Sequence, residues 1–268
     1  MSFTKLHQTS WLSDSPAKAN IIIVHGLAEH CGRYKHVGEF FSARGYNVFT
    51  YDQRGHGKSE GMRSYVHSMD ELVGDLRQMV AQVREQENDK PLYVLGHSMG
   101  TQVVLSYLLD YQDEIEGAMV SAPVIIPGDD TPPFLIAVAK LLSRIVPRFR
   151  VASLDGGSVS RDPEEVHKYD EDPLNYRGKI PARTGAELFH TMDRIQAGMQ
   201  TISLPILIMH GTADSLVSVE GSHLLHEEVA SQDKTLKLYG GLYHEILNEP
   251  EKEQVMGDIL EWLEKRVN

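Results

Sequence analysis

Six short apolar segments recur along the chain and are separated by longer segments with helical periodicity. They are Ile21–Val24, Val48–Tyr51, Leu92–Leu95, Ala118–Val120, Ile206–Met209 and Leu236–Tyr239. Continuous apolar runs of this length indicate strands that are buried on both faces. A series of such strands alternating with helices is typical of a mostly parallel sheet that helices cover. We therefore predict an α/β fold built on one central sheet.

Helix signals occupy the segments between these strands. Ser68-Met69-Asp70-Glu71 fits a capping box, and apolar residues follow it at helical spacing as far as Val83. Near the end of the chain, Glu249-Pro250 fits a helix start. The residues of this last helix that are predicted to face inward are Val255, Ile259, Trp262 and Leu263. Both apolar stripes predict core packing.

The regular alternation stops between Val124 and Ala186. Prolines and glycines cluster in this stretch at Pro127-Gly128, Pro132-Pro133 and Gly156-Gly157. We interpret residues 124–186 as an insertion that forms a cap over the carboxyl edge of the sheet. Residues 1–123 and 187–268 are then predicted to form the core of the fold.

Composition limits the classes of partner and compartment. The chain has 268 residues, a formal net charge of −12 and one cysteine, Cys31. The length fits one large domain with an insertion. The acidic charge argues against a nucleic-acid partner, because phosphate binding relies on Lys and Arg. A single cysteine excludes an intrachain disulfide and a cysteine-based metal site, and it is typical of a protein in the reducing cytoplasm.

Targeting and membrane-spanning signals are weak. Met1–Ser10 lacks the charged start, apolar stretch and cleavage site of a secretory signal, so we expect the mature protein to begin here. The apolar runs Ile21–Val24 and Phe134–Ala139 are far shorter than the about 20 residues that cross a bilayer. We therefore expect a cytoplasmic protein that meets membranes, where it does so, from the surface.

The pentapeptide Gly96-His97-Ser98-Met99-Gly100 lies between an apolar run and the helix-like segment Thr101–Leu109. A serine on such a strand-to-helix turn has a strained backbone and exposes its hydroxyl above the sheet. The two glycines allow the strand and the helix to pass without collision. We predict that Ser98 is a nucleophile on this turn.

A serine hydroxyl is a poor nucleophile until a base removes its proton, and the base must itself be oriented. In α/β-hydrolases the acid and then the histidine follow the serine along the chain. Asp214 follows the predicted strand Ile206–Met209, and His244 follows Leu236–Tyr239. Open α/β sheets place their ligands at these carboxyl ends of strands. We predict a catalytic triad of Ser98, Asp214 and His244.

Other residues offer alternatives for these roles. Asp52 also ends a strand, but it precedes the serine and a glycine-rich turn follows it, which favours a structural role over that of triad acid. His97 is fixed within the elbow, and His210 is interpreted as a loop anchor. Cys31 is not favoured as a nucleophile.

The tetrahedral intermediate that a serine nucleophile forms carries an oxyanion that two backbone N–H groups must stabilise. One is predicted at Met99, the residue after the nucleophile, and the other at Leu27 in the loop after the first predicted strand.

Several longer motifs point to one family. They are His25-Gly-x-x-Glu29-His30 with Gly32-Arg33-Tyr34, Gly55–Gly61, Gly96–Gly100, Val159-Ser160-Arg161 through Tyr169, Asp172-Pro173-Leu174 and Ser231–Lys237. With these motifs the chain resembles the monoacylglycerol lipases of the α/β-hydrolase superfamily nearly end to end. The resemblance implies an α/β-hydrolase fold with a helical cap. It also implies hydrolysis of monoacylglycerol to glycerol and fatty acid, without cofactor or metal, through an acyl-enzyme on Ser98.

The resemblance further implies that Glu29, Arg33 and Tyr169 lie near a small polar pocket for the glycerol head. Glu29 is then expected to accept a hydrogen bond from a glycerol hydroxyl. The alternative is that Glu29 and Arg33, one helical turn apart, pair with each other.

The predicted cap has a charge opposite to that of the whole chain. Between Thr131 and Leu154 there is no Asp or Glu, whereas Lys and Arg are present. On a helix over residues 133–146, Lys140, Ser143 and Arg144 share one narrow face. The remaining apolar arc consists of Phe134, Leu135, Ile136, Val138, Leu141, Leu142 and Ile145. An apolar surface edged by basic residues favours docking on a membrane surface, and the alternative is that the arc packs onto the core.

Two other functions stay open at this point. A lysophospholipase or general carboxylesterase would share the triad and differ in the head-group pocket, where the acidic Glu29 favours uncharged glycerol over a phosphate. A non-catalytic hydrolase fold used for binding is disfavoured because all three triad residues are present. The oligomeric state is not predicted.

Overall fold

The computed structural model describes residues 5–87, 89–127, 133–152 and 156–267. Its main sheet has seven strands in the order β1-β3-β2-β4-β5-β8-β9. Their bounds are β1 Gln8–Trp11, β2 Ala19–Val24, β3 Tyr46–Tyr51, β4 Leu92–His97, β5 Gly117–Ser121, β8 Ile206–Gly211 and β9 Lys234–Tyr239. Strand β1 is antiparallel to β3, and the other neighbours are parallel. The predicted mostly parallel α/β sheet is confirmed.

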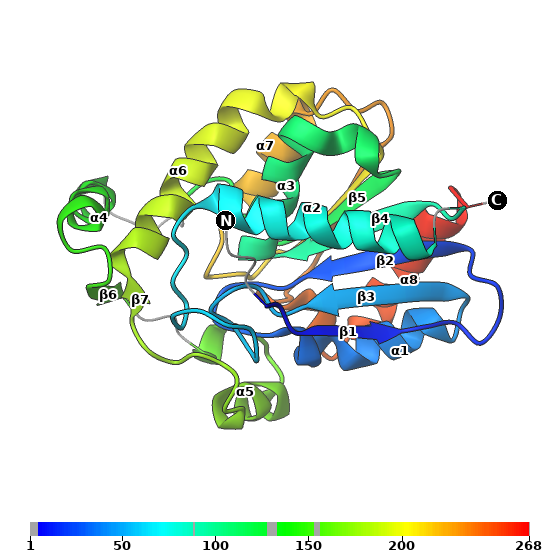
Figure 1. The fold of residues 1–268 in the computed structure, drawn as a ribbon, viewed down its shortest axis with the longest axis horizontal. Helices are drawn as coiled ribbons and strands as arrows, with labels where there is room; N and C mark the ends of the chain where they lie inside the picture. Colours follow the sequence, from blue (N-terminus) through cyan, green and yellow to red (C-terminus); the bar gives the residue numbers. More distant parts are fainter. Residues whose placement is uncertain (1–4, 88, 128–132, 153–155, 268) are drawn as a thin grey trace.

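Helices cover both faces of this sheet (Figure 1). Their bounds are α1 Lys35–Ser42, α2 Met69–Gln86, α3 Met99–Tyr111, α6 Ala182–Gly198, α7 Glu220–Glu228 and α8 Lys252–Glu264. Because side chains alternate along a strand, Ile22 of β2 packs into the core under α2 and α3, whereas Ile23 packs into the core under α1 and α8. The helices thus seal two hydrophobic cores and leave the strand ends free to carry functional loops.

Two strands differ from the sequence-based expectation. Strand β9 was predicted to be buried on both faces, but most of its residues are only half-buried because it forms an edge of the sheet. Strand β1 was not predicted, because its sequence Gln-Thr-Ser-Trp has no apolar run. It forms the opposite, antiparallel edge, where one side of the strand has no neighbour and polar residues are tolerated.

The predicted helix starts lie close to the observed ones. Ser68 caps α2, with its hydroxyl oxygen accepting a hydrogen bond from Glu71 N over 3.3 Å. Helix α8 begins at Lys252, two residues after Pro250, and the four predicted inward-facing residues are buried. Single 3₁₀ turns complete the fold at η1 Cys31–Tyr34, η2 Gln112–Glu114, η3 Gly156–Ser158, η4 Met199–Thr201 and η5 Ile246–Asn248.

The segment between β5 and α6 forms a separate group of elements. They are α4 Pro133–Ile145, β6 Arg150–Ala152, α5 Pro163–Glu171 and β7 Ile180–Pro181, with β6 and β7 paired antiparallel. Figure 1 shows them beyond the end of the sheet toward which β2 and β3 point. Helix α6 begins in this group, contacts α4 and continues along α3. Within the described ranges, no helix combines the length and the apolar character needed to cross a membrane.

Candidate active site

Ser98 occupies the turn between β4 and α3. Its φ of 51° and ψ of −123° place this non-glycine residue in the left-handed half of backbone space, which costs conformational energy. A Cβ on Gly100 would come within 2.1 Å of the Val24 carbonyl oxygen, and one on Gly96 within 2.7 Å of the Gly100 oxygen. Only glycine at these two positions allows so close an approach of helix and strand. The turn has the geometry of a nucleophile elbow.

The backbone around Ser98 is firmly held. Its N–H donates to the Ser121 carbonyl over 3.0 Å, and its own carbonyl accepts from Thr101 N over 2.8 Å and Thr101 Oγ1 over 2.6 Å. Among the described residues, none forms a hydrogen bond with the Ser98 side-chain hydroxyl. The turn therefore holds the serine in place while leaving Oγ available.

Asp214 and His244 lie together at the carboxyl ends of β8 and β9. Asp214 Oδ2 is 2.7 Å from His244 Nδ1 and 3.0 Å from His210 Nε2, and all three side chains are buried. Asp214 Oδ1 accepts backbone hydrogen bonds from Leu216 and Val217. These contacts fix the carboxylate, and the carboxylate in turn orients the His244 ring with its Nε2 turned away from Asp214.

The Ser98 elbow lies next to the Asp214–His244 pair. The ring of His97, next to Ser98, lies 4.8 Å from the ring of His244 between centroids. The structure therefore brings the three predicted triad residues, from three loops that are distant in sequence, to one edge of the sheet.

Electrostatics distinguishes the two neighbouring histidines. Burial lowers the pKa of His244, but the adjacent Asp214 carboxylate outweighs burial and raises that pKa above its ordinary value. Burial and the His244 charge lower the pKa of His97 to about 4. Burial opposes ionisation of Asp214 as well, yet His244 and His210 hold its pKa well below the usual range. Asp214 is thus charged at neutral pH, His97 is neutral, and His244 can exchange a proton.

Asp52, the alternative triad acid, has a structural role. Asp52 Oδ1 accepts a hydrogen bond from Cys31 N over 2.8 Å and its Oδ2 accepts one from Lys58 N over 2.7 Å, so both oxygens hold a turn. One ligand atom each from His7, Cys31 and Asp52 lies within 4.8 Å of the others. Burial raises the pKa of the Cys31 thiol, and a protonated thiol beside an already engaged carboxylate is a poor metal ligand set.

The loop after β2 passes directly over the elbow. A Cβ on Gly26 would lie 3.1 Å from Ser98 Cβ, and Leu27 is the next residue of this loop. Ala28 has a φ of 68°, and its carbonyl accepts a hydrogen bond from Tyr176 N of the α5–β7 segment over 2.7 Å. Met99 is the first residue of α3, immediately after Ser98. Leu27 and Met99 thus lie on the two backbone segments that meet at the serine.

Glu29, Arg33 and Tyr169 form one buried cluster near this loop. Arg33 Nη1 donates to Glu29 Oε2 over 3.0 Å, and the guanidinium lies 4.8 Å from the centroid of the Tyr169 ring. Glu29 Oε1 also accepts from Gly26 N over 2.6 Å and from the Tyr34 hydroxyl over 3.0 Å. The structure therefore contains the Glu29–Arg33 pair that the sequence left as an alternative.

Glu245 is a member of this cluster that sequence reasoning missed. It accepts two hydrogen bonds from Arg33, each over 2.6 Å, and a third from Asn248 over 2.9 Å. Its position directly after His244 was the available signal, but its partner lies 212 residues away in sequence.

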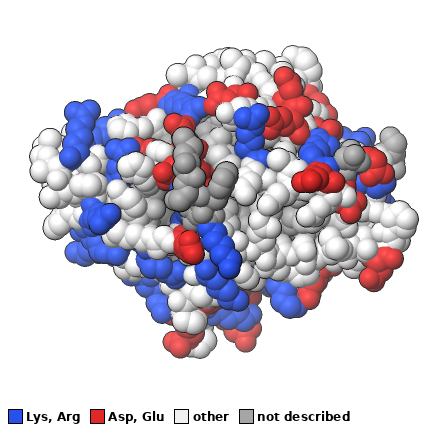
Figure 2. Space-filling model, in the orientation of Figure 1, with Lys and Arg blue, Asp and Glu red and all other residues white. Residues whose placement is uncertain are grey.

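Most of the described residues of the α4 arc face outward, whereas Leu142 is half-buried. Phe134, Leu141 and Ile145 are 67%, 57% and 68% exposed. On the opposite side of the helix, Ser143 is buried and Lys140 pairs with Asp193 of α6 over 2.9 Å. Figure 2 shows uncharged surface bordered by Lys and Arg at the end of the molecule where Figure 1 places α4. The side chains of Leu135 and Ile136, also assigned to the arc, lie outside the described part.

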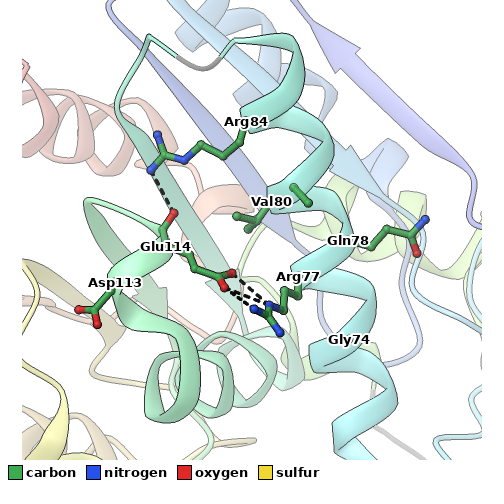
Figure 3. A pocket seen from close by; sticks show the side chains of 8 residues that line it. Gly74, Arg77, Gln78, Val80, Arg84, Asp113 and Glu114 are labelled. Carbon is green, nitrogen blue, oxygen red and sulfur yellow. Dashed lines mark hydrogen bonds and ion pairs between the residues drawn. The ribbon is translucent and has the colours of Figure 1, made fainter.

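A cavity of about 810 Å³ lies between α2 and η2, away from these loops (Figure 3). Its Arg77 pairs with the Glu114 carboxylate, and its Arg84 donates to the Glu114 carbonyl. Because Glu114 precedes β5, the cavity lies near the amino end of that strand, at the edge of the sheet opposite the triad. Its cationic groups are already paired, and we assign it no ligand.

Comparison with known proteins agrees with this geometry. Residues 15–251 match the family described as serine aminopeptidase, S33. The chain is 40% identical over 253 residues to the monoacylglycerol lipase of Mycolicibacterium smegmatis, covering 94% of this chain and 90% of that protein. It is also similar to the crystal structure of Paleococcus ferrophilus monoacylglycerol lipase, with a TM-score of 0.88, 34% identity and coverage of 97% and 98%.

A second solved structure extends the likeness. The crystal structure of a soluble variant of the monoglyceride lipase from Saccharomyces cerevisiae, in complex with a substrate analog, gives a TM-score of 0.88 at 25% identity. The match covers 99% of this chain and 93% of that one. The chain therefore belongs to the monoacylglycerol lipase family of the α/β-hydrolases.

Proposed function

We propose that this protein hydrolyses the ester bond of monoacylglycerols to glycerol and free fatty acid. The observation that carries the proposal is the buried pair of Asp214 and His244, 2.7 Å apart beside a strained Ser98 elbow. Such a pair beside a serine whose hydroxyl has no hydrogen-bond partner among the described residues supports acyl transfer through a covalent intermediate. The relatives named as monoacylglycerol lipases support the choice of substrate.

In this mechanism His244 takes the proton from Ser98 Oγ as the oxygen attacks the ester carbonyl. Asp214 holds the imidazole in the required tautomer and stabilises the imidazolium that forms. The backbone N–H groups of Leu27 and Met99 receive the oxyanion. His244 then protonates the departing glycerol oxygen, and a water molecule activated by the same histidine releases the fatty acid from Ser98.

This mechanism sets the pH dependence of kcat/KM. The base must be neutral, so activity falls as the pH drops through the pKa of His244. Because Asp214 raises that pKa, we expect the half-maximal point above 6.5, the ordinary value for histidine. A pH series of initial rates on a short ester measures it. A profile that stays flat down to pH 4 would exclude His244 as the base.

The cluster of Glu29, Arg33 and Tyr169 supports a polar head-group pocket. We place the glycerol head against this cluster, where the paired Glu29 and Arg33 present one polar wall. Arg33 is shared between the Glu29 and Glu245 carboxylates, so the cluster has one negative charge in excess and does not attract an anionic head group. Uncharged glycerol is therefore favoured over the phosphate of a lysophospholipid.

Head-group choice is tested with three substrates that share one acyl chain: a monoacylglycerol, a lysophosphatidylcholine and an ethyl ester. The proposal predicts the highest kcat/KM for the monoacylglycerol. Higher kcat/KM for lysophosphatidylcholine would identify a lysophospholipase with the same triad, and equal values for all three would identify a general carboxylesterase.

Residues 124–186 are proposed to act as the cap over this site, and α4 as the part of the cap that docks on bilayers containing dissolved substrate. The exposed arc, with basic residues at its border, supports docking, because apolar side chains can enter the interface while Lys and Arg face the headgroups. A peripheral enzyme of this kind needs no membrane-spanning helix.

The docking proposal predicts the effect of Leu141→Glu. A charge in the centre of the exposed arc should reduce binding to vesicles and activity on vesicle-borne monoacylglycerol by about tenfold, with activity on a water-soluble ester unchanged. Leu12→Glu is the matched control, because Leu12 is equally exposed at 58% but lies on the loop after β1. Docking through α4 is wrong if both variants bind vesicles as the wild type does.

A further inference from the structure

Three buried charges connect the two loops on either side of Ser98. Both carboxylate oxygens of Glu245 accept hydrogen bonds from the Arg33 guanidinium, each over 2.6 Å. Arg33 also donates a hydrogen bond to Glu29 over 3.0 Å. The exposed fractions of the three side chains are 6%, 9% and 4%. Charges so well shielded are weakly screened by salt, so their mutual orientation matters.

Each end of this chain of contacts belongs to a different part of the site. Glu245 directly follows His244, and its N–H donates to the Val159 carbonyl over 2.8 Å. Glu29 closes the loop after β2, because its Oε1 accepts the Gly26 N–H over 2.6 Å. Leu27, the proposed oxyanion donor, lies between Gly26 and Glu29. A single guanidinium thus couples the histidine loop to the oxyanion loop.

The charges also explain why the orientation of the Arg33 guanidinium matters for catalysis. A carboxylate bonded one residue from an oxyanion donor would repel the negative charge that develops on the substrate. Arg33 offsets part of the Glu29 charge, because it is shared between two carboxylates. The bidentate hydrogen bonds to Glu245 orient the guanidinium so that Nη1 faces both of them. Burial opposes ionisation of Glu245, but Arg33 lowers the pKa of this carboxyl to about 2, so the ion pair persists at neutral pH.

We infer that Glu245 is a positioning residue for catalysis, which acts through Arg33 and Glu29 to hold the oxyanion loop against the histidine loop. The inference rests on the proposed serine hydrolase mechanism and adds a residue that touches neither substrate nor Ser98. It predicts an effect on turnover of any ester, whatever its head group.

The test compares Glu245→Gln with Asp75→Asn on a short-chain ester without glycerol. Asp75 is a matched control, because it also binds an arginine, Arg54, through both oxygens and is 8% exposed, but it lies on α2. In Glu245→Gln we expect kcat to fall on the order of 10- to 100-fold with little change in KM, as for a small misplacement of catalytic groups. Asp75→Asn should retain the wild-type kcat even if it is less stable.

The pH profile provides a readout that a merely structural role would not move. The charged and titratable groups facing His244 are Asp214 and Glu245, the Glu29–Arg33 pair, His97 and, through Asp214, His210. Loss of the Glu245 charge removes one group that favours the imidazolium, so the acid limb of kcat/KM should move to lower pH. Asp75→Asn should leave the limb in place.

Removing one partner of a buried ion pair can prevent folding, so a second variant is needed. Arg33→Lys keeps the positive charge but cannot form the bidentate hydrogen bonds to Glu245, so it should lower kcat in the same way. The inference is overturned if either folded variant keeps the wild-type kcat, whatever its pH profile. An inactive wild type would instead contradict the proposed function, which separates the two failures.

Discussion

Replacing Ser98 with alanine should lower the rate of ester hydrolysis by on the order of 10⁴-fold or more. The hydroxyl is the atom that forms the acyl-enzyme, and the remaining groups can only bind and polarise the ester. Folding should be unaffected, because Ser98 holds the turn through its backbone N–H and carbonyl. Initial rates on monoacylglycerol and the thermal unfolding temperature measure both expectations.

Ser106 provides the matched control for this change. It lies on the same helix, α3, is fully buried, and its hydroxyl has no hydrogen-bond partner among the described residues. Ser106→Ala should therefore keep the wild-type rate. A loss of only a few-fold in Ser98→Ala would mean that another residue is the nucleophile.

Asp214→Asn should reduce kcat by about 10⁴-fold, because an amide cannot hold the imidazole in the tautomer that accepts the serine proton. In the wild type, Asp214 Oδ2 accepts a hydrogen bond from His244 Nδ1 and lies 3.0 Å from His210 Nε2. An asparagine would present an amide nitrogen or a neutral oxygen to these rings. The raised pKa of His244 depends on the same carboxylate, so the acid limb of any residual activity should move to lower pH.

The carboxylate of Asp258 provides a comparison. It bonds to Lys237 and Tyr239 at the outer edge of the sheet, so Asp258→Asn should keep kcat within a few-fold of wild type. If Asp214→Asn kept full activity and a folded Asp52→Asn lost activity, Asp52 would be the triad acid. Asp52 is the alternative that the sequence offers.

The strands and the elbow were predictable because local patterns encode them. An interior parallel strand is apolar throughout, and the Gly-x-Ser-x-Gly pattern marks the elbow locally, although the contact that requires Gly100 is with Val24 at the end of β2. Positions of Asp214 and His244 followed from the same logic, since each comes directly after such a strand. Strand β1 was missed, and β9 was predicted as a strand but wrongly as buried on both faces, because an edge position depends on which strand is absent from one side.

Side-chain partners between distant segments could not be predicted in this way. Spacing alone suggested a Glu29–Arg33 pair, but the role of Glu245 depends on how the loops after β2 and β9 fold against each other. For α4, periodicity separated an apolar arc from a narrow polar face without showing which faces the protein. The contact of Lys140 with Asp193 answers that question, and it requires α6 to lie on the polar side.

The most direct test of the central claim is the release of both products from a pure 1-monoacylglycerol by wild type and by Ser98→Ala. The account predicts glycerol and fatty acid in equal amounts from the wild type, and neither above background from the variant. Absence of glycerol release by the folded wild type, or equal release by the variant, would contradict it.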